Sequence, residues 1–344
     1  MQGVRGSSPL RSTNTSGVAR RVAPLVFPGL SDRDRRLWVG HWRVLAPGIE
    51  SLTRHEESGR PQGGRFPRVG GGREALFGVG PWRVLAPGME SLTRHEENGT
   101  ETVPDFPNFA DLLGLAKETA LTAGAYAREQ QLQGVEVAAT KSSRTDVVTA
   151  ADRATEHLIR NLLTQARPTD GFLGEESGAS AGTSGLTWVV DPIDGTVNYL
   201  YRLPAWAVSI AVVAGDPDPR HWRPLAGVVF SPVSGELFHA TAGGGSWLGE
   251  RRLAVNQDVG LADALIGTGF SYRADIRLEQ LGVLERLIGR ARDIRRIGAA
   301  SLDLCNVAAG RTDAYYERQL NPWDHAAGAL IAREAGAWVG GLHG

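Results

Sequence analysis

Cysteine is nearly absent from this sequence: its 344 residues include only Cys305, so no intramolecular disulfide can form. Such scarcity is typical of proteins in a reducing compartment, and we expect a cytoplasmic location. No run of 18 apolar residues occurs, which predicts that no helix spans a membrane. The first residues, MQGVRGSSPLR, hold no continuous apolar stretch and do not resemble a secretory signal peptide.

Lysine is also scarce, with two lysines against 35 arginines, and charge is unevenly distributed. Residues 1–104 hold 15 arginines, 10 acidic residues and no lysine, a net charge of +5. Residues 105–344 hold 22 basic and 28 acidic residues, a net charge of −6. Because nucleic acid carries a dense negative charge, an acidic globular part argues against unaided binding to it.

A duplicated segment lies in the N-terminal part. Residues 39–59 (VGHWRVLAPGIESLTRHEESG) recur at 79–99 with 18 of 21 positions identical. Two copies are too few for a solenoid, and surface-type residues are copied as faithfully as apolar ones, which indicates a recent duplication. The surrounding stretches are rich in Gly, Pro and Arg and show little periodicity that would support a core. We expect residues 1–104 to be a disordered or non-native extension.

Only one methionine follows Met1, and it lies inside the second copy. Our hypothesis is that the natural start is Met89 and that residues 1–88 are upstream sequence read through. Two alternatives remain open. The acid-free first 31 residues are also similar to an organellar transit peptide. A basic arm that binds nucleic acid is the second alternative, although lysines and interleaved aromatic residues are missing.

From residue 105 onward the sequence has the pattern of a single globular domain of about 240 residues. The spacing of apolar residues predicts helices at 109–132, 151–165, 278–293, 301–310 and 324–336. β-Branched runs predict strands at 186–191, 205–215, 225–232, 293–298 and 313–317, a strand–turn pair at 137–152 and a hairpin at 235–248. This alternation favours a layered α/β or α+β sandwich.

Acidic residues gather at the ends of these predicted elements. Taken singly, each fits a structural role, as a helix N-cap, a solvated loop or a tight turn. Together they suggest one site. The residues are Asp152, Glu175, Glu176, Asp191, Asp194 and Asp324.

Asp191 is the most informative of them because it ends the apolar run WVV, which is typical of a buried strand. Burial and the nearby Asp194 would favour the protonated form of its carboxyl group. A divalent cation reverses that balance, since it favours deprotonated oxygen ligands. An all-oxygen ligand set suits Mg²⁺, and no cluster of Cys and His has the spacing of a zinc site.

The residues between and after the two aspartates also favour a phosphate site. Pro192 fixes the backbone, so the carbonyl group of Ile193 can turn toward a metal. Gly195 allows a tight turn, after which Thr196 can begin a helix. The N–H groups of Gly195 and Thr196 would then form a cradle for an anion. We predict that the acids hold cations, and that cations and backbone together hold a phosphate.

Three motifs in this order, GEES (174–177), DPIDGT (191–196) and NPWDHAAG (321–328), resemble the inositol monophosphatase family. The similarity runs from about residue 109 to residue 338. It implies a layered αβαβα sandwich, Mg²⁺ dependence, hydrolysis of a small phosphate monoester and a homodimer. It also implies one further strand and helix beyond the final LHG, so we interpret the chain as lacking its C-terminal end.

The resemblance assigns metal ligands by matched motif. Glu175, Asp191 and the carbonyl of Ile193 would hold a first Mg²⁺. Asp191, Asp194 and Asp324 would hold a second, and Glu175 with waters a weaker third.

The resemblance also assigns catalytic and substrate residues. Thr196, hydrogen-bonded to Asp152, would orient the attacking water, with Glu175 as the third catalytic residue. From the sequence pattern alone, the favoured interpretation of Glu317 is a surface acid on a plain strand. The implied substrate contacts are Asp194, Gly195, Thr196, the backbone at Ala300, and Glu317.

The function implied is Mg²⁺-dependent hydrolysis of myo-inositol 1-phosphate by a metal-activated water. Related phosphatases act on phosphoadenosine phosphate, fructose 1,6-bisphosphate or histidinol phosphate, and these substrates stay open. A hypothesis of another class is a non-catalytic protein that binds RNA or a protein partner. The complete ligand set and the charge of −6 argue against it.

Overall fold

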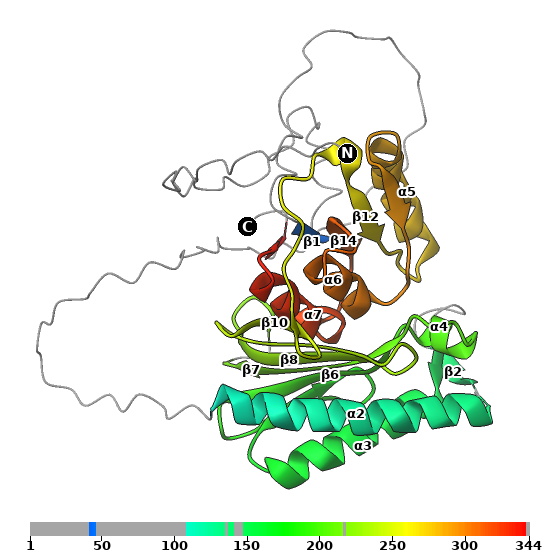
Figure 1. The fold of residues 1–344 in the computed structure, drawn as a ribbon. Helices are drawn as coiled ribbons and strands as arrows, with labels where there is room; N and C mark the ends of the chain where they lie inside the picture. Colours follow the sequence, from blue (N-terminus) through cyan, green and yellow to red (C-terminus); the bar gives the residue numbers. More distant parts are fainter. Residues whose placement is uncertain (1–40, 46–107, 135–136, 141–146, 216–217, 342–344) are drawn as a thin grey trace, which may run out of the picture.

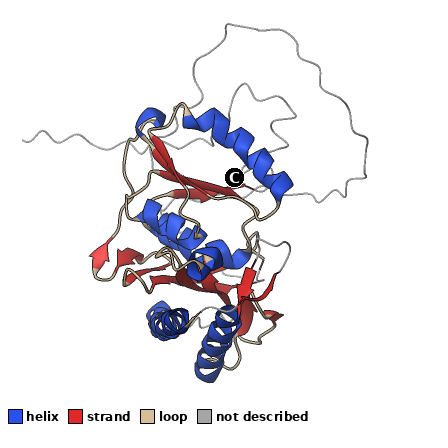
Figure 2. Cartoon of the chain, turned by 90° about the vertical axis from the view of Figure 1, so that its right-hand side faces the viewer, coloured by secondary structure: helices blue, strands red, loops and turns tan. Residues whose placement is uncertain are grey.

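The computed structural model describes residues 41–45, 108–134, 137–140, 147–215 and 218–341. Five layers stack along the molecule (Figure 1). Helices α2 (Phe109–Gln133) and α3 (Ala150–Ala166) cover the outer face of an eight-stranded sheet, and α6 (Ala300–Ala308) and α7 (Pro322–Glu334) cover its inner face. A five-stranded sheet and α5 (Ala274–Ile288) complete the stack, which Figure 2 shows from the side. The predicted layered αβαβα sandwich is confirmed.

The eight-stranded sheet forms the centre of the fold. Its strands β6 and β7 are buried along their whole length, because helices cover both faces. All neighbours in this sheet are antiparallel except β4 and β6, which are parallel. In spatial order the strands are β11 (Arg251–Arg252), β10 (Gly245–Leu248), β9 (Glu236–Thr241), β8 (Arg223–Ser231), β7 (Ala207–Ala214), β6 (Leu186–Asp194), β4 (Gly171–Gly174) and β5 (Gly178–Ser180).

Side chains of β6 alternate between two hydrophobic cores. Trp188 and Val190 pack with α2 and α3 on the outer face, while Val189 packs with α6 and α7 on the inner face. All three are about 1% exposed or less. The strand therefore carries its last residues, beginning with Asp191, to a place between two dry layers.

The five-stranded sheet contains a strand from the N-terminal part of the chain. Its order is β13 (Asp293–Arg295), β12 (Leu265–Thr268), β14 (Ala314–Arg318), β1 (His41–Leu45) and β15 (Trp338–Gly340). β1 is antiparallel to both β14 and β15. Its sequence HWRVL belongs to the first copy of the duplicated segment, so these five residues differ from the expected disorder.

The rest of residues 1–104, including the second copy and Met89, lies outside the described residues. The physical reason for the difference is that β14 and β15 each offer an unpaired edge, and a short segment rich in β-forming residues joins them. Compositional reasoning averages over a hundred residues and misses such a short element.

Removing residues 1–88 should lower the midpoint of thermal unfolding by at least about 5 °C. The shortened chain lacks β1, so β14 loses a partner and β15 loses its place in the sheet. Circular dichroism of both chains during heating measures the effect. Equal midpoints would show that β1 contributes no measurable stability to the sheet.

Element boundaries differ from the sequence-based expectations in a few places. The predicted strand at 186–191 extends through Asp194, with a register shift between Asp191 and Asp194. The last helix begins at Pro322 with Asn321 as its N-cap, so Asp324 lies in the first turn and is not the cap. The predicted strand–turn pair is present as β2 (Val137–Thr140) and β3 (Val147–Thr149). None of the described helices is long and apolar enough to cross a membrane.

Candidate active site

The corner between β6 and the short helix α4 (Thr196–Leu200) brings two aspartates together. Gly195 is the N-cap of α4 and has a left-handed φ of 92°. A Cβ atom at this position would lie 3.1 Å from the carbonyl oxygen of Ala205 and 3.2 Å from that of Gly298. Only glycine tolerates both the conformation and this close approach. The turn that separates Asp194 from Thr196 is therefore fixed.

Carboxylates from distant segments share this corner. Burial raises the pKa of Asp191 well above its usual range, and the charges on Glu175, Asp194 and Asp324 raise it further. Burial also raises the pKa of Asp324 well above its usual range, and Glu175 and Asp194 add to that rise. Because the charges of Glu175, Asp194 and Asp324 all raise the pKa of Asp191, the four groups lie in one electrostatic environment.

Asp194 is held by the start of α6. The backbone N–H of Ser301 donates to Asp194 Oδ2 at 2.7 Å, and that of Ala300 donates to Oδ1 at 3.2 Å. The hydroxyl group of Ser301 also donates to Oδ2. Burial raises the pKa of Asp194, and these hydrogen bonds oppose the rise. The predicted substrate contact at Ala300 thus lies against a predicted metal ligand.

Two other carboxylates accept hydrogen bonds from nearby backbone. The N–H of Ile193 donates to Asp191 Oδ1 at 3.0 Å. The N–H of Asn321 donates to Asp324 Oδ2 at 2.6 Å in a capping box at the start of α7. Each of these two side chains therefore has one oxygen occupied by the backbone of its own segment.

The chemistry of this cluster fits a hard divalent cation. Within the described ranges, no three acidic, His or Cys side chains are arranged so that they could hold a metal ion as they stand. Mutual repulsion nevertheless gives the buried carboxylates a strong reason to bind a cation. The predicted Mg²⁺ ligands, namely Glu175, Asp191, Asp194, Asp324 and the carbonyl of Ile193, all offer the oxygen atoms that this ion prefers.

Thr196 and Asp152 lie in contact beside the cluster. Thr196 Oγ1 lies 3.1 Å from Asp152 Oδ1 and 3.2 Å from the carbonyl oxygen of Ile193, and it can donate its single hydrogen to either. Asp152 is 1% exposed and lies in the first turn of α3, after its first residue Ala150. When the hydroxyl donates to Asp152, the oxygen of Thr196 keeps lone pairs that can accept a hydrogen from water.

Glu317 lies on β14, facing the same region. It is partly buried, and the hydroxyl group of Tyr315 donates to its Oε2. Burial raises the pKa of Glu317 to about 7, against the opposing influence of Tyr315 and of Arg296. A Cβ atom at Gly269 would lie 1.9 Å from Oε2, so only glycine leaves room for this carboxylate. Glu317 is therefore not a surface acid, and its pKa responds to Asp194.

Three residues near the site were not found from the sequence. Ser301 directly follows Ala300 and holds Asp194. Arg296 lowers the pKa of both Asp194 and Glu317 through its charge. Glu156 lies on α3, four residues after Asp152, and accepts two backbone hydrogen bonds from the turn that follows Glu175. In the sequence, only its distance of four residues from Asp152, which puts both side chains on one face of a helix, could have indicated Glu156.

The sequence of this chain is similar to that of several known proteins. The sequence profile of the inositol monophosphatase family matches residues 109–344. The inositol-1-monophosphatase of Mycobacterium leprae is 46% identical over 208 residues, which cover 58% of this chain and 69% of that protein. The Nus factor SuhB of Pasteurella multocida is 39% identical over 241 residues, which cover 68% of this chain and 86% of that protein.

The fold of this chain is also similar to that of solved structures. The extragenic suppressor protein suhB of Bartonella henselae matches with a TM-score of 0.61 and 38% identity, over 66% of this chain and 85% of that chain. Mycobacterium tuberculosis SuhB matches with a TM-score of 0.57 and 42% identity, over the same shares of the two chains. The similarity therefore covers the layered fold.

Proposed function

Because the chain belongs to the inositol monophosphatase family, we propose that it hydrolyses a small phosphate monoester, myo-inositol 1-phosphate, with the help of bound Mg²⁺. The observation that carries this proposal is the shared electrostatic environment of four carboxylates next to the Thr196–Asp152 pair. A buried cluster of like charges costs stability unless a cation offsets it, which favours a function for the cluster.

The proposed ligands divide between two principal ions. Glu175, Asp191 and the carbonyl of Ile193 would hold the first, and Asp191, Asp194 and Asp324 the second. Glu175 with waters would hold a weaker third ion. When bound, Mg²⁺ lowers the pKa of a coordinated water and neutralises charge on the phosphate and on the leaving oxygen.

The residues of the chain then orient the reactants. Thr196 donates its hydroxyl hydrogen to Asp152 and accepts a hydrogen from the attacking water, so a lone pair of that water faces the phosphorus. The N–H groups of Gly195 and Thr196 at the start of α4 donate to a phosphate oxygen. Glu317, once deprotonated, accepts a hydrogen bond from a hydroxyl group of the polyol, beside the backbone at Ala300.

Phosphate release from a panel of substrates tests the proposal. We expect Mg²⁺-dependent release from myo-inositol 1-phosphate that exceeds release from phosphoadenosine phosphate, fructose 1,6-bisphosphate and histidinol phosphate. A preference for one of those three would retain the phosphatase and replace the substrate. No release from any of them by a folded protein that binds Mg²⁺ would contradict the proposed activity.

A second candidate function is the binding of RNA or of a protein partner; relatives from Xylella fastidiosa and Pasteurella multocida carry a name other than a phosphatase's, Nus factor SuhB. The charge of −6 on residues 105–344 argues against unaided RNA binding. Retention of the protein on immobilised RNA at increasing salt discriminates the two. Retention that survives physiological salt and persists in an inactive variant would favour the binding function.

Mg²⁺ should stabilise the protein more at about pH 8 than at about pH 5. Folding raises the pKa of Asp191, Asp194 and Asp324 above 3.8, so the metal-free folded state retains protons that the unfolded chain has lost. Its stability therefore falls as pH rises through the raised pKa values. Mg²⁺ competes with those protons and removes the repulsion that remains at high pH.

Thermal unfolding with and without Mg²⁺ at the two pH values measures this difference. At about 100 times its dissociation constant, Mg²⁺ should raise the midpoint by about 5 °C or more at the higher pH. An equal rise at both pH values would show that protonation of these aspartates is not linked to metal binding.

A further inference from the structure

The turn that carries Glu175 is held by a buried carboxylate on the neighbouring helix. This turn joins β4 to β5, and its first N–H, that of Glu175, donates to the carbonyl oxygen of Val190 on β6 at 3.3 Å. The next two N–H groups point toward α3. That of Glu176 donates to Glu156 Oε2 at 2.8 Å, and that of Ser177 donates to Glu156 Oε1 at 2.7 Å.

Glu156 is enclosed where it makes these contacts. Only 2% of the residue is exposed, and both carboxylate oxygens accept a backbone hydrogen bond. The close approach depends on Gly174, where a Cβ atom would lie 2.4 Å from Glu156 Oε2. Two charge-assisted hydrogen bonds in a buried place fix the position of a turn more firmly than contacts at the surface do.

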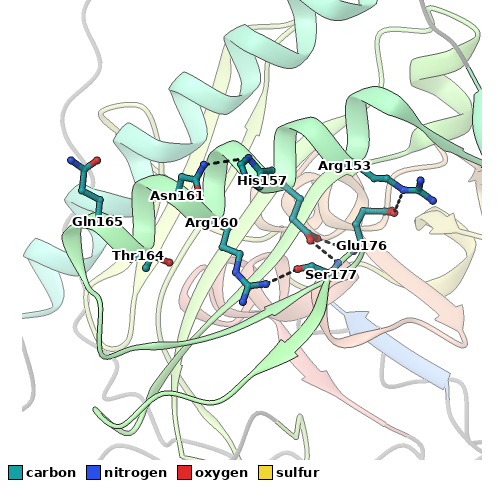
Figure 3. A pocket seen from close by; sticks show the side chains of 9 residues that line it. Arg153, His157, Arg160, Asn161, Thr164, Gln165, Glu176 and Ser177 are labelled. Carbon is teal, nitrogen blue, oxygen red and sulfur yellow. Dashed lines mark hydrogen bonds and ion pairs between the residues drawn. The ribbon is translucent and has the colours of Figure 1, made fainter.

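Figure 3 shows two arginines of α3, Arg153 and Arg160, beside the same turn. The Arg153 Nε atom lies 3.9 Å from Glu176 Oε2, and the Arg153 side chain is 58% exposed. Arg160 donates to the hydroxyl group of Ser177 at 3.0 Å, a contact drawn in Figure 3, and to that of Ser180 on β5 at 2.9 Å. Exposed ion pairs contribute little to holding a backbone in place. Among the described side chains of α3, Glu156 is the one that accepts hydrogen bonds from the backbone of this turn, so we take it as the main restraint that α3 places on the turn.

The same helix also holds the other half of the site. Asp152 and Glu156 are four residues apart and so lie on one face of α3. Asp152 contacts Thr196, and Glu156 fixes the turn that follows Glu175. From this geometry we propose that Glu156 is a positioning residue for divalent metal binding: it sets the orientation in which Glu175 reaches the metal. This inference rests on the proposed function, since it takes Glu175 as a ligand.

Glu156 would raise the affinity of the site for the metal ion without itself being a ligand. Without its carboxylate, the turn would sample several orientations, and metal binding would have to order it again. Loss of a partner outside the ligand set typically weakens metal affinity by about 10- to 100-fold. A residue that only stabilised the helix would leave metal affinity unchanged.

The full chain, titrated with Mn²⁺ as a paramagnetic probe and followed by electron paramagnetic resonance, provides the test. In Glu156→Gln, the side-chain NH₂ group faces a backbone N–H, so one hydrogen bond is lost; we expect Mn²⁺ to bind 10- to 100-fold more weakly. The matched control is Arg160→Gln, which changes side-chain contacts to Ser177 and Ser180 but leaves the backbone hydrogen bonds of the turn intact, and it should stay within about threefold of the wild type.

The outcomes separate this inference from the proposed function. A wild-type chain that binds no Mn²⁺ would refute the proposed metal site itself. Wild-type-like Mn²⁺ affinity in folded Glu156→Gln would overturn only the role of Glu156. If that variant does not fold, Glu156→Asp replaces it: its shorter side chain keeps the charge but cannot reach both N–H groups. Unchanged Mn²⁺ affinity in Glu156→Asp would also overturn the role.

Discussion

Asp191→Asn should reduce Mg²⁺-dependent phosphate release by at least about 10³-fold in kcat/KM. Asp191 is the one carboxylate proposed to contact both principal ions, and it is 2% exposed near the end of the buried strand β6. A neutral amide binds Mg²⁺ far more weakly than a carboxylate does, so both ions lose a ligand. Steady-state kinetics at saturating Mg²⁺ measure the loss.

This variant should still fold. Asparagine keeps an oxygen that can accept the hydrogen bond from the Ile193 N–H, and it removes one of the repelling charges near Glu175 and Asp324. The metal-free variant should therefore unfold at the same temperature as the wild type or higher. Near-normal turnover in Asp191→Asn would refute its role as a shared ligand.

Asp313→Asn provides a matched control for this substitution. Asp313 is also buried, but its carboxylate accepts hydrogen bonds from the side chain of Asn256 and the N–H of Leu265, both at 2.7 Å, away from the site. Its replacement should lower stability by about 1 to 3 kcal/mol without abolishing turnover. Comparison of Asp191→Asn with Asp313→Asn therefore distinguishes the effect of losing a metal ligand from the effect of neutralising a buried carboxylate.

Thr196→Val should lower kcat by about 10²-fold or more while KM changes little. Valine has the shape of threonine without its hydroxyl group, so the water loses the acceptor that points it toward the phosphorus. The contact between Thr196 Oγ1 and Asp152 Oδ1, at 3.1 Å, disappears as well. Thr196→Ser keeps the hydroxyl group and should stay within about tenfold of the wild type.

A double-mutant cycle shows whether Thr196 and Asp152 act as one unit. Asp152→Asn leaves an oxygen that accepts from Thr196 but also an NH₂ group that competes for the same hydroxyl. If the two residues orient one water together, the losses in Thr196→Val and Asp152→Asn should not add in the double variant. Fully additive losses, or a normal kcat in Thr196→Val, would count against a joint role.

The sequence predicted elements whose cause lies in their own residues. β6 and β7 are continuous apolar runs because helices cover both faces of their sheet, and that composition is visible without a structure. The turn at Gly195 was equally visible, since a glycine directly follows Asp194. Local chemistry determines such features.

Features that depend on residues far away in the chain could not be predicted from the local sequence pattern. Glu156 looks like any glutamate on an amphipathic helix until the N–H groups of residues 176 and 177 are seen to face it. β1 is five residues inside a Gly- and Arg-rich region, and its partners lie at the other end of the chain. The last helix was predicted to begin at Asp324, but it begins at Pro322, because Asn321 and Asp324 form the capping box that determines its start.

The position of β1 has a consequence for the order in which the protein folds. His41 pairs with Arg318, which lies 277 positions later in the chain, so ribosomes release β1 long before either of its neighbours exists. Closing so long a loop costs entropy before any contact is gained, and topologies with such distant contacts fold slowly. We therefore expect the eight-stranded sheet to form while the chain is still being made. The five-stranded sheet would close last, after synthesis of β15, and until then its unpaired edges are open to aggregation and to chaperones.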